Sequence, residues 1–123
     1  MLERDRASEA LGITLVSTAG GRAVTTMTVG PQMLNGFDVV HGGLIFALAD
    51  TAFAVACNED DSMTLAAGAE ISFLRPARLG QVLTATAELR ARSGRSGIYD
   101  VQVVDETGAV IAEFRGKSRT VHR

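Results

Sequence analysis

The chain has 123 residues, of which 46% are hydrophobic and 21% are charged. This balance is typical of a soluble globular protein and excludes an intrinsically disordered one. The formal net charge of −2 argues against nucleic acid as the main partner, because phosphate binding requires a basic surface. The length predicts one domain, spanning residues 1–123, with a single packed core.

The first half of the chain predicts a short helix followed by a β-hairpin. Mixed charged and alanine residues at 3–10 are compatible with the helix. Two segments rich in β-branched residues, 13–18 and 22–29, flank a turn at Ala19-Gly20-Gly21, which is a hairpin signal. Residues 33–36 then indicate a turn or loop.

A long apolar helix is predicted at about residues 42–58, with a polar loop after it at 59–62. Polar and apolar residues alternate most clearly in the last two of the four strands expected in the second half. These strands lie at about 64–74, 81–92, 98–105 and 109–118.

The long helix is apolar on nearly all sides, so it must be enclosed by other parts of the protein. The predicted elements follow one another along the chain as two strands, one helix and four strands. The simplest way to enclose the helix with these elements is an antiparallel sheet curled around it. The predicted fold class is therefore α+β, in the hotdog arrangement of a sheet wrapped around one central helix. The alternative is an α+β sandwich with the helix on one face.

Cellular location is indicated by the cysteine content and by the absence of targeting signals. The single cysteine, Cys57, permits no internal disulfide, which favours a reducing compartment. The N-terminal sequence is charged and lacks the apolar core of a signal peptide. The apolar run at 42–57 is interrupted by Asp50 and is shorter than the ~20 residues that span a bilayer. We expect a cytoplasmic protein without membrane contact.

Asp50 is the one charged residue in the middle of the apolar helix. A buried carboxylate without a partner costs several kcal/mol or shifts its pKa. The sequence therefore either uses Asp50 for chemistry or holds it with hydrogen bonds. The helix begins at Gly42-Gly43, and the first amides of a helix are unpaired donors at the positive end of its dipole. These glycines let a ligand approach the backbone, or they serve close packing.

The spacing of these two groups predicts how the protein assembles. Gly42 and Asp50 are eight positions apart, which is roughly 12 Å along a helix. One reacting carbon has to lie ~3 Å from both groups, and a single helix cannot easily achieve this. Two antiparallel copies related by a twofold axis can, if each gives its helix start to the other's carboxylate. The spacing predicts a homodimer with two shared active sites. We also expect these dimers to pair into a dimer of dimers.

The segment from Asn35 to Asn58 reads N-x₅-H-G-G-x₆-D-x-A-F-A-x-A-x-N. It resembles the phenylacetic-acid-degradation thioesterases, a branch of the hotdog-fold acyl-CoA thioesterases. The resemblance covers nearly the whole chain and includes shorter motifs at 33–36, 73–76 and 114–118. It implies the hotdog fold and hydrolysis of acyl-CoA thioesters, in particular aryl-acetyl-CoA of phenylacetate catabolism, to free acid and CoA.

The resemblance also implies roles for individual residues. Asp50 is the catalytic carboxylate, as a nucleophile or as the base for a water. The N–H of Gly42 polarises the thioester carbonyl, Asn35 places water or the acyl group, and His41 orients the loop. From the residues alone, Asn35 could equally be a turn former and His41 a helix cap.

Four further residues are expected to bind substrate: Gly43, Phe46, Thr51 and Arg95. Gly43 shares the open helix start, and Phe46 contributes to the acyl pocket or to the core. Related hydroxybenzoyl-CoA thioesterases often carry Thr or Ser where this chain has Ala54, so a hydroxyl role would fall to Thr51 or to a residue elsewhere. Arg95, in a glycine-rich turn, is the candidate for the CoA phosphates. No cofactor or metal is expected, since the histidines and the cysteine lack ligand spacing.

Two other functions fit a hotdog domain. A hydratase or dehydratase would pair a histidine with a carboxylate, and no carboxylate partner is expected beside His41. An acyl-CoA-binding protein without activity would not need Asp50. Release of a free thiol from an acyl-CoA separates hydrolysis from both.

Overall fold

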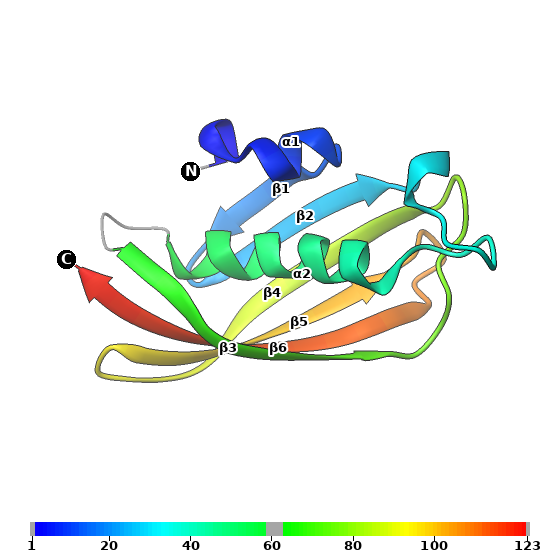
Figure 1. The fold of residues 1–123 in the computed structure, drawn as a ribbon. Coiled ribbons are helices and arrows are strands. Elements are labelled where there is room, and N and C mark those ends of the chain that lie inside the picture. Colours follow the sequence, from blue (N-terminus) through cyan, green and yellow to red (C-terminus); the bar gives the residue numbers. More distant parts are fainter. Residues whose placement is uncertain (1, 59–62, 123) are drawn as a thin grey trace.

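The computed structural model describes residues 2–58 and 63–122 (Figure 1), so the loop expected at 59–62 lies outside the described residues. The elements in chain order are η1 (Leu2–Arg4), α1 (Arg6–Ala10), β1 (Thr14–Ala19), β2 (Arg22–Thr28), η2 (Pro31–Met33), α2 (Gly42–Cys57), β3 (Met63–Phe73), β4 (Val82–Ser93), β5 (Ser96–Val104) and β6 (Val110–His122).

The described strands form one antiparallel sheet in the order β1-β2-β4-β5-β6-β3. The sheet curls around α2 (Figure 1), and every one of these strands contacts the helix. The core lies between them, with side chains such as Leu48, Phe53, Tyr99 and Val101 almost fully buried. The predicted hotdog arrangement, a sheet wrapped around one central helix, is confirmed.

One side of α2 stays partly open in the single chain, contrary to the expectation that the helix is enclosed all round. Gly43, Ala47, Asp50 and Ala54 are exposed or half-buried, while most other positions of the helix are buried. Their spacing places them along one face of the helix. The mid-helix carboxylate therefore lies on a stripe of small residues that the chain itself leaves uncovered.

The strand boundaries agree with the predictions to within a few residues, with one larger difference in β6. That strand runs to His122 rather than to 118, because it pairs with β5 on one side and with β3 on the other. The hairpin between β1 and β2 turns at Gly20 and Gly21, whose φ angles of 60° and 79° suit glycine.

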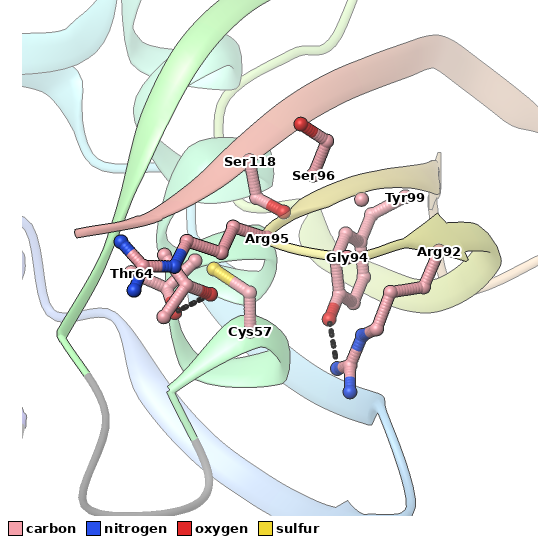
Figure 2. A pocket seen from close by; sticks show the side chains of 10 residues that line it. Cys57, Thr64, Arg92, Gly94, Arg95, Ser96, Tyr99 and Ser118 are labelled. Carbon is pink, nitrogen blue, oxygen red and sulfur yellow. Dashed lines mark hydrogen bonds between the residues drawn. The ribbon is translucent and has the colours of Figure 1, made fainter. Parts of the chain in front are cut away.

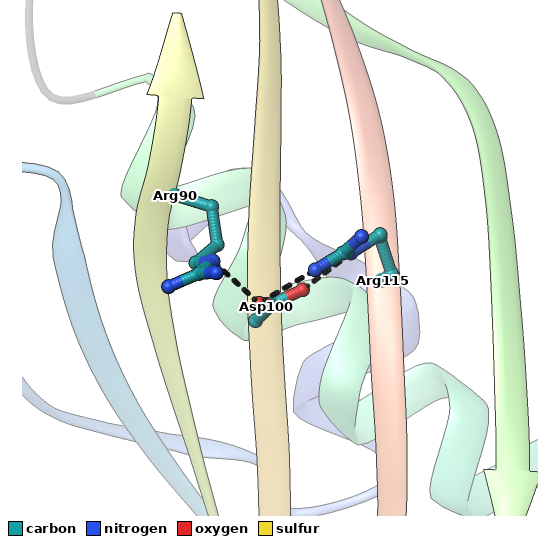
Figure 3. A network of polar contacts seen from close by, with 3 residues as sticks. All are labelled: Arg90, Asp100 and Arg115. Carbon is teal, nitrogen blue, oxygen red and sulfur yellow. Dashed lines mark hydrogen bonds and ion pairs between the residues drawn. The ribbon is translucent and has the colours of Figure 1, made fainter.

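The outer face of the sheet carries a cluster of paired charges (Figure 3). Arg115 donates to both carboxylate oxygens of Asp100, at 2.7 and 3.0 Å, and Arg90 lies 3.3 Å from the same carboxylate. The hydrogen bond from Arg115 lowers the pKa of Asp100 below its ordinary value. Both arginines are ion-paired with Asp100 and are therefore poor candidates for binding a ligand's phosphates.

Candidate active site

The start of α2 presents two backbone donors without acceptors. The first hydrogen bond of the helix runs from Leu44 N–H to His41 C=O, at 3.0 Å. Within the described ranges, the N–H groups of Gly42 and Gly43 have no partner. Because both lie at the positive end of the helix dipole, they are suited to a developing negative charge on a substrate oxygen.

The two glycines differ in what lies beside them. A Cβ on Gly42 would come within 2.9 Å of the Phe73 ring, so its missing side chain serves close packing. A Cβ on Gly43 would meet nothing within 4 Å. Open approach to the backbone, which the sequence suggested for both, exists at Gly43 alone.

Asp50 is half-buried and makes no hydrogen bond or ion pair with any described residue. The interpretation in which hydrogen bonds hold it for structural reasons therefore has no support in this part of the chain. Burial raises the pKa of Asp50 above its ordinary value, and the negative charge of Asp5 raises that pKa further. The carboxylate is thus partly desolvated and has no described partner, so it is free to act as a base or a nucleophile.

The Asp5 charge comes from the short helix α1, which docks beside Asp50. Asp5 caps α1 by accepting from the Ser8 N–H at 3.0 Å and from its hydroxyl at 2.6 Å. The Ser8 hydroxyl in turn lies 3.1 Å from the Thr51 hydroxyl on α2. Nothing in the sequence pattern marked this contact, because it joins residues far apart in the chain.

Thr51, the expected source of a hydroxyl, is buried. Its hydroxyl donates to the Ala47 carbonyl at 2.8 Å and contacts Ser8. Both bonds tie α2 to its own preceding turn and to α1. The structure therefore gives the Thr51 hydroxyl structural partners and does not place it with the donors at Gly42 and Gly43.

Asn35 holds the loop that leads into α2. Its Oδ1 accepts from the N–H groups of Phe37 and Val39, at 2.8 and 3.4 Å, and its own N–H donates to Val39 C=O at 2.8 Å. Asp38 in this loop has a φ of 61°, a left-handed backbone conformation that occurs in tight turns. The Nδ2 donors of Asn35 have no acceptor among the described residues, so the turn role and a role toward substrate are compatible.

His41 occupies the N-cap position, but its side chain caps nothing. Its backbone fixes the loop, because its N–H donates to Met33 C=O at 3.0 Å while its C=O accepts from Leu44. The imidazole is exposed and makes no hydrogen bond among the described residues.

The two phenylalanines of the helix divide between pocket and core. Phe53 is almost fully buried and packs edge-on against Tyr99, at a ring-centroid distance of 5.5 Å. Phe46 is only half-buried, one turn before Asp50, and contacts Phe114 at 5.2 Å. Phe46 thus remains available to an acyl group, while Phe53 belongs to the core.

Arg95 lies away from the helix start. It lines a polar cavity of about 100 Å³ together with Cys57, Arg92, Ser96 and Ser118 (Figure 2). Cys57 is the last residue of α2, so this cavity is at the far end of the helix, roughly 22 Å from Gly42 along the helix axis. Burial raises the pKa of Cys57 to about 11, which keeps it a neutral thiol.

Residues 2–58 and 63–122 show neither a metal-binding cluster nor a membrane-spanning helix. No three histidine, cysteine or carboxylate side chains in these ranges are grouped to hold a metal ion. No helix in them is both long and apolar enough to cross a bilayer.

Replacing Asp50 with asparagine is expected to stabilise the protein at neutral pH. The pKa of Asp50 is higher in the folded than in the unfolded protein, so protonation of Asp50 stabilises the folded state at pH values below the ordinary aspartate pKa. This stabilisation is lost as the pH rises through the folded-state pKa. At pH 7 the wild-type carboxylate is therefore charged and desolvated, whereas an amide is neutral. Thermal unfolding should show Asp50→Asn melting higher than wild type at pH 7, with the difference shrinking near pH 3. A lower melting temperature for the variant at pH 7 would contradict this account.

The chain is similar to known proteins along most of its length. A family model described as the Thioesterase superfamily matches residues 37–112. The acyl-coenzyme A thioesterase PaaI of Escherichia coli (strain K12) is 47% identical over 121 residues, which are 98% of this chain and 86% of the relative.

Solved structures agree with this match. The structure of the E. coli PaaI protein from the phenylacetic acid degradation operon has a TM-score of 0.96 and 47% identity, covering 98% of this chain and 88% of that one. A single-residue mutant of the phenylacetic acid degradation protein PaaI from Thermus thermophilus has a TM-score of 0.91 and 34% identity, covering 95% of this chain and 100% of that one. With unpaired amides at the helix start and an unengaged carboxylate in mid-helix, the chain belongs to the Thioesterase superfamily and is a thioester hydrolase.

Proposed function

We propose that the protein hydrolyses acyl-CoA thioesters to free acid and CoA, with Asp50 as the catalytic carboxylate. The observation that carries the proposal is the pairing, on one helix, of unpartnered amides at Gly42 and Gly43 with an unengaged carboxylate at Asp50. The E. coli relative is named an acyl-coenzyme A thioesterase, which supports CoA as the thiol.

The chemistry follows from these groups. The thioester oxygen accepts hydrogen bonds from the helix-start amides, and the charge that develops on it is stabilised by the helix dipole. Asp50 either attacks the carbonyl carbon or takes a proton from a water that attacks it. Collapse of the tetrahedral intermediate expels the CoA thiolate. In the first route, water then cleaves the acyl-aspartyl bond to release the acid.

The site is completed by a second copy of the chain. The roughly 12 Å between Gly42 and Asp50 along one helix prevents both from reaching one carbonyl group. The uncovered stripe of Gly43, Ala47, Asp50 and Ala54 has only one side chain longer than a methyl group, so a partner helix can approach it closely. An antiparallel partner would bring its Asp50 to the helix start of the first chain.

The sheet edge supports the same assembly. Strand β3 is an edge strand of the described sheet, and its first half exposes Met63 and Leu65. An unpaired edge with apolar side chains is a template for pairing with another strand. We propose a homodimer with two shared sites, a dimer of dimers as the larger assembly, and a single hotdog domain over residues 1–123. Its location would be cytoplasmic, in keeping with its unpaired buried thiol.

The acyl group is proposed to be compact and aromatic, as in phenylacetyl-CoA or its hydroxylated forms. The T. thermophilus relative is named a phenylacetic acid degradation protein, which supports this class. The half-buried Phe46 ring, one turn from Asp50, provides an apolar surface of matching size.

The CoA phosphates are proposed to bind near Arg95. The cavity that it lines also carries hydroxyl groups, which together with guanidinium suit phosphate oxygens. Arg90 and Arg115, by contrast, are held by Asp100. The phosphates of CoA are separated from the thioester by the pantetheine arm, so a phosphate site remote from Gly42 is compatible with the chemistry.

Replacing Arg95 with alanine should raise KM for phenylacetyl-CoA by about tenfold and change kcat little, because a phosphate contact is made alike in ground and transition states. Added salt should raise the wild-type KM more than that of the variant. Steady-state kinetics at low and high salt measure both effects. Arg90→Ala serves as the control, since it removes an arginine that faces Asp100. Equal KM values for Arg95→Ala and wild type would contradict phosphate binding at this residue.

A further inference from the structure

The last residue of β3, Phe73, lies against the start of α2. Three atoms of its ring are 2.9 to 3.3 Å from the position that a Cβ on Gly42 would occupy. This contact between Phe73 and Gly42, which are far apart in the sequence, thus brings an edge strand to the start of the helix. Yet Phe73 is 51% exposed. One part of the ring is fixed on Gly42, and the rest is open beside the unpaired donors.

We propose that Phe73 is a specificity-determining residue, whose ring forms the wall on which an aromatic acyl group lies. The proposal rests on the proposed acyl-CoA hydrolysis. A substrate carbonyl bound to the Gly42 or Gly43 N–H must place its acyl group within reach of this ring. Aromatic rings prefer edge-on or offset contact with other rings, which a straight acyl chain cannot reproduce.

The same contact accounts for glycine at position 42. With Gly42, the ring can lie directly on the backbone, and beside it a Cβ added to Gly43 would meet nothing within 4 Å, which leaves that side of the helix start open. A methyl group at position 42 would keep the N–H but displace the ring. Position 42 therefore sets the position of Phe73 as well as supplying a donor.

The first experiment measures selectivity. The ratio of kcat/KM for phenylacetyl-CoA to that for hexanoyl-CoA should fall about tenfold in Phe73→Leu, the loss expected for one aromatic contact. Phe73→Tyr keeps the ring and should keep the ratio. Leu65→Ala alters another exposed apolar side chain of β3, 52% exposed, and should leave the ratio unchanged. Light scattering on each variant follows the assembly.

The second experiment tests the coupling to position 42. Gly42→Ala should lower kcat/KM for both substrates, because the displaced ring obstructs the donors. Adding Phe73→Leu removes the ring atoms that the new methyl group meets. The double variant should regain activity toward hexanoyl-CoA and remain poor with phenylacetyl-CoA.

The outcomes separate this inference from the proposed function. Absence of thiol release by the wild-type protein from either substrate would overturn both. If the wild type is active, an unchanged ratio in Phe73→Leu would overturn the role of Phe73 alone. A Phe73→Leu protein that loses its dimer mass, while Leu65→Ala keeps it, would make Phe73 an interface residue and likewise overturn the inference.

Discussion

Replacing Asp50 with asparagine is expected to lower kcat for phenylacetyl-CoA by about 10²–10⁴-fold while the protein stays folded. The amide has nearly the same shape as the carboxylate but can neither accept a proton from water nor attack the thioester. No hydrogen bond of the described chain is lost, because Asp50 makes none there. The measurement is the rate of thiol release at saturating substrate, together with circular dichroism of both proteins.

A second carboxylate close to the site provides the control. Asp5→Asn makes the same chemical change, and asparagine is also a good N-cap for α1. This variant should remain active. The Asp5 charge raises the pKa of Asp50, so removing that charge should lower the pKa. The acid limb of the kcat/KM profile of Asp5→Asn should therefore lie at lower pH than that of the wild type. If Asp50→Asn retains more than about a tenth of wild-type turnover, well short of the loss expected for a positioned base, Asp50 is not the catalytic carboxylate.

Mixing two inactive variants is expected to restore activity. An Asp50→Asn chain keeps the helix-start donors, and a Gly42→Pro chain keeps the carboxylate but lacks the Gly42 N–H. In a heterodimer, one of the two shared sites combines the intact groups. Random exchange at equal concentrations should therefore recover about a quarter of wild-type activity, since half of the dimers are heterodimers with one intact site. The assay is thiol release after subunit exchange.

The local structure permits this substitution. His41, the residue before position 42, has a ψ of 132°, which suits a residue that precedes proline. Proline at the first position of a helix is well tolerated. It also adds a Cβ toward Phe73, so Gly42→Ala, which adds a Cβ and keeps the N–H, is the necessary comparison. If heterodimers form, as judged by mass, and no activity returns, each site is built within one chain.

The sequence was sufficient to predict the central helix and the order of helix and strands along the chain. The run of apolar residues at 42–57 indicated a helix at the centre of the fold, and alternation in β5 and β6 indicated strands with one buried face. The same reasoning singled out Gly42 and Asp50 as candidates, because the chemistry of a helix start and of an isolated carboxylate can be inferred from local sequence alone.

What the sequence did not predict depends on contacts between distant segments. Phe73 on Gly42, and Ser8 on Thr51, join residues whose proximity is set by how β3 and α1 dock on the central helix. The extension of β6 to His122 likewise depends on pairing with two strands at once. Local patterns carry no signal for such pairings.

The exposure of one face of α2 was missed for a related reason. The composition of the helix indicated enclosure on all sides, and within one chain the sheet covers most of the helix but not the stripe around Asp50. The small, mainly apolar residues of that stripe fit a surface that a second chain covers. A pattern of hydrophobicity does not distinguish burial by the same chain from burial by a partner.

Cleavage of an acyl-CoA at its thioester bond is the activity on which every proposed role depends. The direct measurement is quantification of free CoA thiol and of phenylacetic acid after the purified wild-type protein is incubated with phenylacetyl-CoA. Equal amounts of the two products, formed with turnover and absent with Asp50→Asn, are the expected result. Bound but intact phenylacetyl-CoA, with neither product released, would contradict it.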